Sequence, residues 1–117
     1  MKVLCKKILT LNGEELEYHP EVTIGSTYDV VTITASPEGT PVLRIAANSG
    51  QPSLWPARMF SVNVPVINDN WRIAASADGT ICLGPPQFCV KGFWEDYFDD
   101  DPAALRAYQE EFLEYRD

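Results

Sequence analysis

Short hydrophobic runs, separated by turn-forming residues, fill the first 90 positions of the chain. In STYDVVTITA, residues 26–35, both alternating sets of positions carry strand-forming residues, so this strand should be covered on both faces. KVLCKKILTL, PVLRIAAN and FSVNVPVI predict further strands. In LWPARMF the proline should prevent regular strand pairing and favour a short helical turn. Asp78 and Gly79 lie between two more runs and predict a hairpin with a primed two-residue turn.

After residue 92 the hydrophobic period becomes helical. One face of the predicted helix carries Leu105, Tyr108, Phe112 and Tyr115. Asp101 before Pro102 predicts where the helix begins, since Asp caps free amides and proline suits the first helical position. FWEDYF predicts a shorter preceding helix. We therefore expect a mainly β (α+β) fold in a single domain over residues 1–117. A small antiparallel, partly open barrel should occupy residues 1–90, and acidic helices should occupy residues 92–117.

The net charge of −8 is concentrated near the end of the sequence. Residues 1–92 contain eight acidic and seven basic residues, whereas residues 93–117 contain nine acidic and two basic residues. Binding to nucleic acid or to an anionic membrane requires cations to neutralise phosphate, so this charge argues against both. It favours a basic protein partner.

Cys5, Cys82 and Cys89 make an odd number of cysteines, and MKVLCKKILTLNGEE does not resemble a signal peptide. Both observations favour reduced, mostly buried thiols and a cytoplasmic location. A bridge between Cys82 and Cys89 across LGPPQF is geometrically feasible and stays open as an alternative. No run approaches the roughly 18 apolar residues of a membrane span.

Catalytic and metal-binding patterns have little support in the sequence. His19 is the single histidine and no Cys-x-x-Cys occurs, so a zinc site lacks ligands. The aspartates around DDD lack the spacing of a calcium loop. Carboxylates one helical turn apart occur by chance in any acidic helix, and a raised pKa would require burial. We expect no enzyme activity and no cofactor.

The acidic, aromatic segment GFWEDYFDDD has two compatible interpretations. Its aromatic residues can fasten the helices to the barrel while its acids keep the surface soluble, or the segment can meet a basic cleft. Trp55 likewise either contacts a partner or folds over one end of the barrel, and Trp71 should be a core residue. The candidate partner-binding residues are Trp94, Glu95, Asp96, Asp99, Asp100, Asp101 and Trp55.

TIGSTYDVVTI followed by PVLRIAANSGQPSLWPARMF resembles small bacterial domains of the Src-homology-3-like barrel type. The resemblance covers roughly a third of the chain, and the matching positions within it are Gly25, Tyr28, Val30, Arg44, Ile45, Gly50, Trp55, Pro56 and Phe60. The later block from Trp71 through DGTICLGP to GFWEDYFDDDPAA resembles the tail of immunity proteins of bacterial polymorphic toxin systems. This resemblance implies a cytoplasmic, non-enzymatic inhibitor that covers the active site of a toxin. The chain is longer than such barrels usually are.

The sequence thus predicts an acidic immunity protein that neutralises a toxin or effector by covering its basic cleft. It should act as a monomer or weak dimer. The alternative is an inhibitor or adaptor from a phage or mobile element that imitates the charge of nucleic acid.

Overall fold

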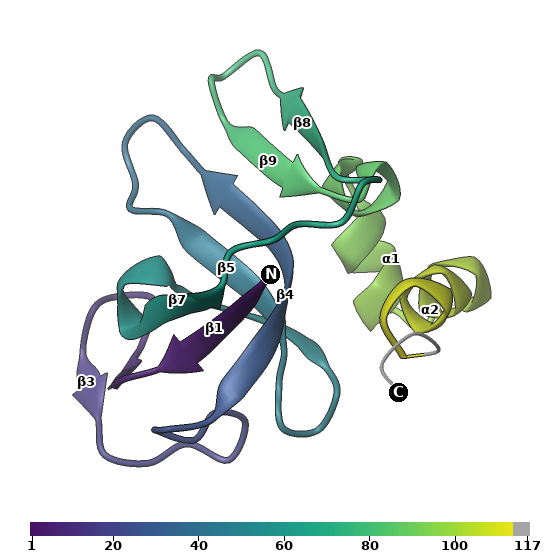
Figure 1. Cartoon of the computed structure of the whole chain (residues 1–117). Helices are drawn as coiled ribbons and strands as arrows, with labels where there is room; N and C mark the ends of the chain where they lie inside the picture. The colour runs from purple at the N-terminus through teal and green to yellow at the C-terminus, as the bar shows by residue number, and fades with distance from the viewer. Residues whose placement is uncertain (114–117) are drawn as a thin grey trace.

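A computed structural model describes residues 1–113 of the chain (Figure 1). The strands are β1 (Lys2–Cys5), β2 (Ile8–Leu9), β3 (Glu15–Leu16), β4 (Thr27–Ala35), β5 (Val42–Ala46), β6 (Pro52–Pro56), β7 (Phe60–Val64), β8 (Arg72–Ala75) and β9 (Ile81–Gly84). The helical elements are η1 (Ala57–Met59), η2 (Pro86–Cys89), α1 (Phe93–Phe98), α2 (Pro102–Tyr108) and η3 (Gln109–Leu113). Seven strands form one antiparallel sheet, and β2 pairs with β3 in a small second sheet.

The long strand β4 organises the sheet. One edge of β4 pairs with β5, and the other edge pairs first with β1 and then with β9. The order β6-β5-β4-β1-β7 leaves β6 and β7 at opposite ends, so within residues 1–113 the sheet is not closed into a barrel. The predicted fold class, mainly β and antiparallel with a C-terminal helical segment, is confirmed.

Two hydrophobic cores lie against the large sheet, and β4 contributes to both. Val30 belongs to the first core and Val31 to the second, as expected because successive residues of a strand point to opposite faces. The first core gathers β1, β2, β5 and β7 with Trp55 and Trp71, which are 7% and 6% exposed. The prediction that the strand at residues 26–35 is covered on both faces is therefore confirmed.

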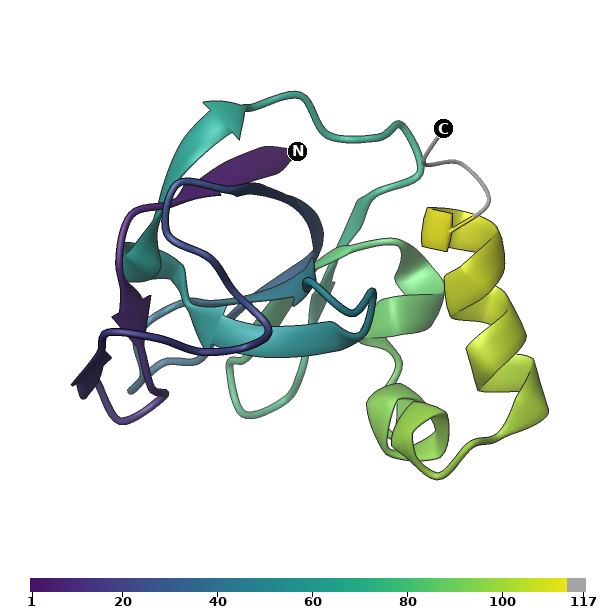
Figure 2. The same cartoon turned by 90° about the horizontal axis from the view of Figure 1, so that it is seen from below.

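The second core joins the sheet to the C-terminal helices, which Figures 1 and 2 show together at the end of the molecule away from β3. Its buried residues are Val31, Phe88, Tyr97, Ala104, Tyr108 and Phe112. Asp101 caps α2 as predicted, because its carboxylate accepts a hydrogen bond from the Ala104 N–H at 3.0 Å. The predicted helix face therefore packs as expected through Tyr108 and Phe112, while Tyr115 lies outside the described residues.

Two local predictions about strands are corrected. KVLCKKILTL forms two short strands instead of one, because the chain bends at Lys6 and Lys7 so that both Cys5 and Ile8 are buried. The proline-containing segment does pair regularly, as β6. The Ala57 N–H donates to the Pro41 carbonyl, so the alternate positions Pro52 and Pro56 turn their nitrogen atoms to the free edge, where no strand hydrogen bond is lost.

The predicted hairpin forms between β8 and β9, but its turn differs from the prediction. Ser76 pairs with Thr80, since the Ser76 N–H donates to the Thr80 carbonyl at 2.9 Å. Three residues, 77–79, therefore lie between the paired residues Ser76 and Thr80, with Gly79 at φ 90°. Asp78 has no positive φ, and a primed turn on Asp-Gly would require one.

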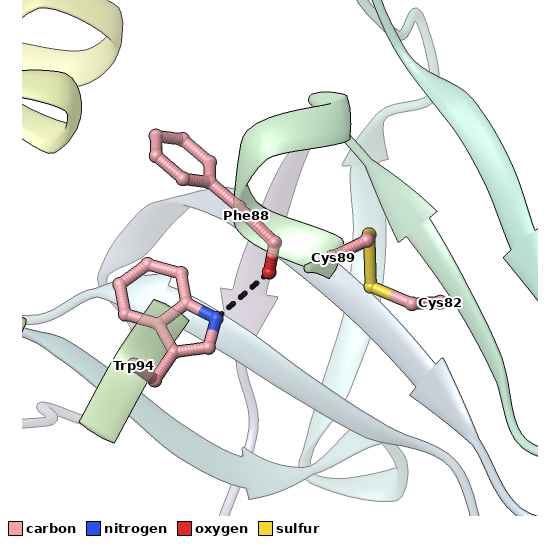
Figure 3. Close-up of a disulfide and its surroundings, with 4 residues drawn as sticks. All are labelled: Cys82, Phe88, Cys89 and Trp94. Carbon is pink, nitrogen blue, oxygen red and sulfur yellow. Dashed lines mark hydrogen bonds between the residues drawn. A yellow bond between two sulfur atoms is a disulfide. The ribbon is translucent and has the colours of Figure 1, made fainter. Parts of the chain in front are cut away.

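The expectation of reduced thiols at Cys82 and Cys89 is wrong, because these residues form a disulfide with a Cα–Cα distance of 5.7 Å (Figure 3). The bond ties the end of η2 to β9. Cys5 is the free cysteine, and it is buried as expected. Disulfides persist mainly in oxidising compartments, so the cysteines no longer support a cytoplasmic location.

Candidate functional site

Helix α1 is held to the sheet by its aromatic residues. Tyr97 is buried, and Trp94 is half-buried with its indole N–H donating to the Phe88 carbonyl at 3.0 Å (Figure 3). The Trp94 ring also contacts the rings of Phe88 and Tyr108. Phe98 differs, since 55% of its surface is exposed. The aromatic residues of this segment therefore act mainly as an anchor, with Phe98 left on the surface.

Two tyrosine hydroxyl groups connect this anchor to the turn between β5 and β6. Tyr97 donates to Gln51 at 3.2 Å, and Tyr108 donates to the Gly50 carbonyl at 2.8 Å. Burial, and after it the negative charge of Asp100, raise the pKa of the Tyr97 phenol. The Tyr97 contact holds α1 to the sheet, and the Tyr108 contact holds α2 to it.

The predicted acids lie on the anchored segment and point into solvent. We call this set the acidic surface: Glu95, Asp96, Asp99, Asp100 and Asp101, all of which are exposed. The structure brings them close together, because the Asp99 and Asp101 N–H groups both donate to the Asp96 carbonyl. Among residues 1–113, the ion pair that the structure contains joins Lys2 to Asp29, so no cation from the described part of the chain neutralises the acidic surface.

Trp55 lies away from the acidic surface, in the first core. It is 7% exposed, contacts the ring of His19 edge-on and donates its indole N–H to Ser53 at 2.9 Å. His19 in turn accepts the Glu21 N–H at its Nδ1 atom. Trp55 thus has little surface to offer a partner.

Sequence reasoning missed Arg44 as a site residue. It projects from the middle of β5 toward α1, is 9% exposed, and lies with its guanidinium carbon 4.2 Å from the centre of the Trp94 ring. Its Nη1 atom donates to the Pro52 carbonyl at 3.3 Å. The Nε atom has no hydrogen-bond partner within the described part of the chain. Burial lowers the pKa of Arg44 to about 10.

Arg44 lines two grooves between the sheet and α1. The larger, which we call the α1 groove, has a volume of about 860 Å³ and is also lined by Leu54, Trp94 and Phe98. The smaller, of about 360 Å³, includes both cysteines of the disulfide. Glu95 and Asp99 of the acidic surface also line the α1 groove. A charged residue inside the otherwise apolar strand VLRIA was the sequence signal that could have revealed this site.

No group of three or more His, Cys, Asp or Glu side chains in the described part of the chain is arranged to hold a metal ion. Within the same residues, no helix is both long and apolar enough to cross a membrane. Comparisons with protein-family models, curated proteins and solved structures found no match. The resemblance to Src-homology-3-like barrels and immunity proteins therefore stays a prediction.

Proposed function

We propose that the chain is a non-enzymatic binding protein that neutralises a toxin or effector by covering its basic active-site cleft, as an immunity protein does. The observation that carries this proposal is the acidic surface: five exposed carboxylates on one short segment, without a cation from the described residues to pair with them. A cationic cleft would supply those missing partners.

The anchoring of α1 supports a binding role. Trp94 and Tyr97 pack into the second core and donate hydrogen bonds to Phe88 and Gln51, so the acids are displayed on a fixed frame. A surface that is already ordered loses less conformational entropy when it binds. Concentrated negative charge also speeds the encounter with a basic partner.

The exposed ring of Phe98 favours this proposal over the imitation of nucleic acid. Phe98 lies between Asp96 and Asp99 in the chain and lines the α1 groove with Glu95 and Asp99, so an exposed apolar residue lies among the acids. Protein interfaces commonly combine an aromatic centre with a charged rim. A mimic of DNA would instead present a regular row of carboxylates along the molecule.

The proposal requires no particular compartment. The disulfide suits an oxidising one, and a toxin can be neutralised wherever it meets its inhibitor.

His19, the single histidine of the chain, packs against Trp55 and accepts a backbone N–H, which supports a structural role for it over a catalytic one.

The test begins with the product of the neighbouring gene, because an immunity protein is encoded beside its toxin. The purified candidate is titrated with the chain, and association rates are measured at low and high salt. Reversal of two acids, E95K with D99K, should slow association at low salt by about tenfold or more.

The matched control is E15K with E17K, which changes the net charge equally at the opposite end of the molecule (Figure 1). With the low-salt measurement made at about 0.1 M ionic strength, where the Debye length is about 10 Å, this control should change the association rate by less than about threefold, because its charges lie more than that length from the acidic surface. Equal effects of the two pairs would show that only net charge matters and would remove the acidic surface from the interface. Failure of the neighbouring product to bind, or unchanged toxin activity in the complex, would contradict the proposed function.

A further inference from the structure

The guanidinium of Arg44 is held in place, but one of its N–H donors has no acceptor among residues 1–113. Its guanidinium carbon lies over the Trp94 ring, 4.2 Å from the ring centre, its Nη1 donates to the Pro52 carbonyl, and 9% of the residue remains exposed. A guanidinium has five N–H donors, and burying a donor without an acceptor is costly. The Nε–H is buried without an acceptor among residues 1–113.

Nothing in the described part of the chain neutralises this buried cation. The ion pair found there, Lys2 with Asp29, does not involve Arg44, which is instead stabilised by the Pro52 carbonyl at 3.3 Å and by the electron-rich face of Trp94. Burial lowers the pKa of Arg44, although it leaves the group charged at neutral pH. A buried cation that lines two grooves and has no anionic partner among residues 1–113 is the arrangement expected of an anion-binding site.

We propose that Arg44 binds the carboxylate of a ligand whose apolar part lies in the α1 groove. A carboxylate is planar and can accept from the edge of a guanidinium whose face is already covered by an aromatic ring. The apolar part would contact Leu54, Trp94 and Phe98, which line the same groove. This site does not depend on the proposed function.

The acids of the α1 groove determine which anion fits. Glu21, Glu95 and Asp99 line it together with Arg44, so a phosphate with two negative charges would be repelled more strongly than a carboxylate with one. An apolar group attached to the carboxylate adds binding energy that does not depend on charge. The groove thus favours a hydrophobic monocarboxylate, a chemistry found at the C-terminal residue of a peptide and in small organic acids.

The experiment uses the oxidised, ¹⁵N-labelled chain and follows the Nε–Hε signal of Arg44 and the indole signal of Trp94 by NMR. The probe is N-acetyl-leucine, and its uncharged amide is the matched control. The expected result is a saturable shift of both signals with the carboxylate and none with the amide. Acetate and inorganic phosphate, added at constant ionic strength, should each bind at least about tenfold more weakly than N-acetyl-leucine.

Two variants locate the site. R44M keeps the unbranched stem but donates no hydrogen bond, and it should weaken N-acetyl-leucine binding by about tenfold or more. E95Q should tighten binding, because it removes a repelling charge from the groove, while the same change should weaken a complex with a basic protein. If R44M does not fold, the proposal is tested by comparing the binding of N-acetyl-leucine and of its amide to the natural chain.

A saturable shift with the amide equal to that with the acid would overturn the proposal, as would the absence of any saturable shift. Equal affinity for phosphate would show that the groove binds anions without selecting a carboxylate. Equal affinity for acetate would show that the apolar lining takes no part.

Discussion

Loss of the disulfide between Cys82 and Cys89 should lower the free energy of unfolding by about 2.4 kcal/mol at room temperature. The bond joins residues separated by seven positions, so it restrains a short loop of the unfolded chain, and loop-closure entropy gives this value. Unfolding entropy of about 2.1 cal/mol/K per residue, over 117 residues, converts the loss into a decrease in Tm of about 10 °C.

The assay is thermal unfolding followed by circular dichroism, with C82S/C89S compared with the natural chain in the absence and presence of a reductant. Reductant should lower the Tm of the natural chain to near that of the variant and leave the variant unchanged. A variant within about 2 °C of the oxidised natural chain would refute the loop-entropy reasoning. Alkylation of the denatured, unreduced chain should modify Cys5 alone, and three modified cysteines would refute the disulfide itself.

Two further predictions concern the two cores. F88A should lower the free energy of unfolding, measured by urea denaturation, by about 3 to 5 kcal/mol, because Phe88 is 1% exposed and contacts four other aromatic rings. The exposed control F98A should lower the same free energy by less than about 1 kcal/mol. Burial raises the pKa of the Cys5 thiol, so the folded chain keeps a proton that the unfolded chain loses, and the free energy of unfolding should fall as the pH rises above about 9. The same denaturation experiment at increasing pH should show a smaller decrease for C5A, and an identical decrease would contradict the assignment to Cys5.

The features that could be predicted from the sequence depend on neighbours along the chain. The cap at Asp101 needs only a carboxylate three positions before a free N–H, and the hairpin at Asp78 and Gly79 needs only a glycine between two strand-forming runs. The helical period likewise placed Tyr108 and Phe112 on one buried face. In each case the determining contact spans a few residues, so the local pattern contains it.

The features that could not be predicted depend on contacts between distant segments. Arg44 could be recognised as a charge in an apolar strand, but its burial follows from the placement of Trp94, fifty positions later, over its guanidinium. The disulfide required the turn after β9 to bring two Cα atoms within 5.7 Å, whereas the argument from compartment pointed to free thiols. The acids could be identified from composition, but their lack of cationic partners within residues 1–113 is visible only in three dimensions.

The disulfide, the α1 groove and the acidic surface belong to one structural unit. Cys89 directly follows Phe88, whose carbonyl accepts the indole N–H of Trp94 (Figure 3). The ring of Trp94 in turn lies 4.2 Å from the guanidinium carbon of Arg44. The bond that holds η2 to β9 therefore also restrains the ring against which the guanidinium lies. The acidic surface is connected to the same ring, because Glu95 directly follows Trp94 in α1. A change at the disulfide thus reaches both candidate sites through Trp94, without contact between either cysteine and the acidic surface being required.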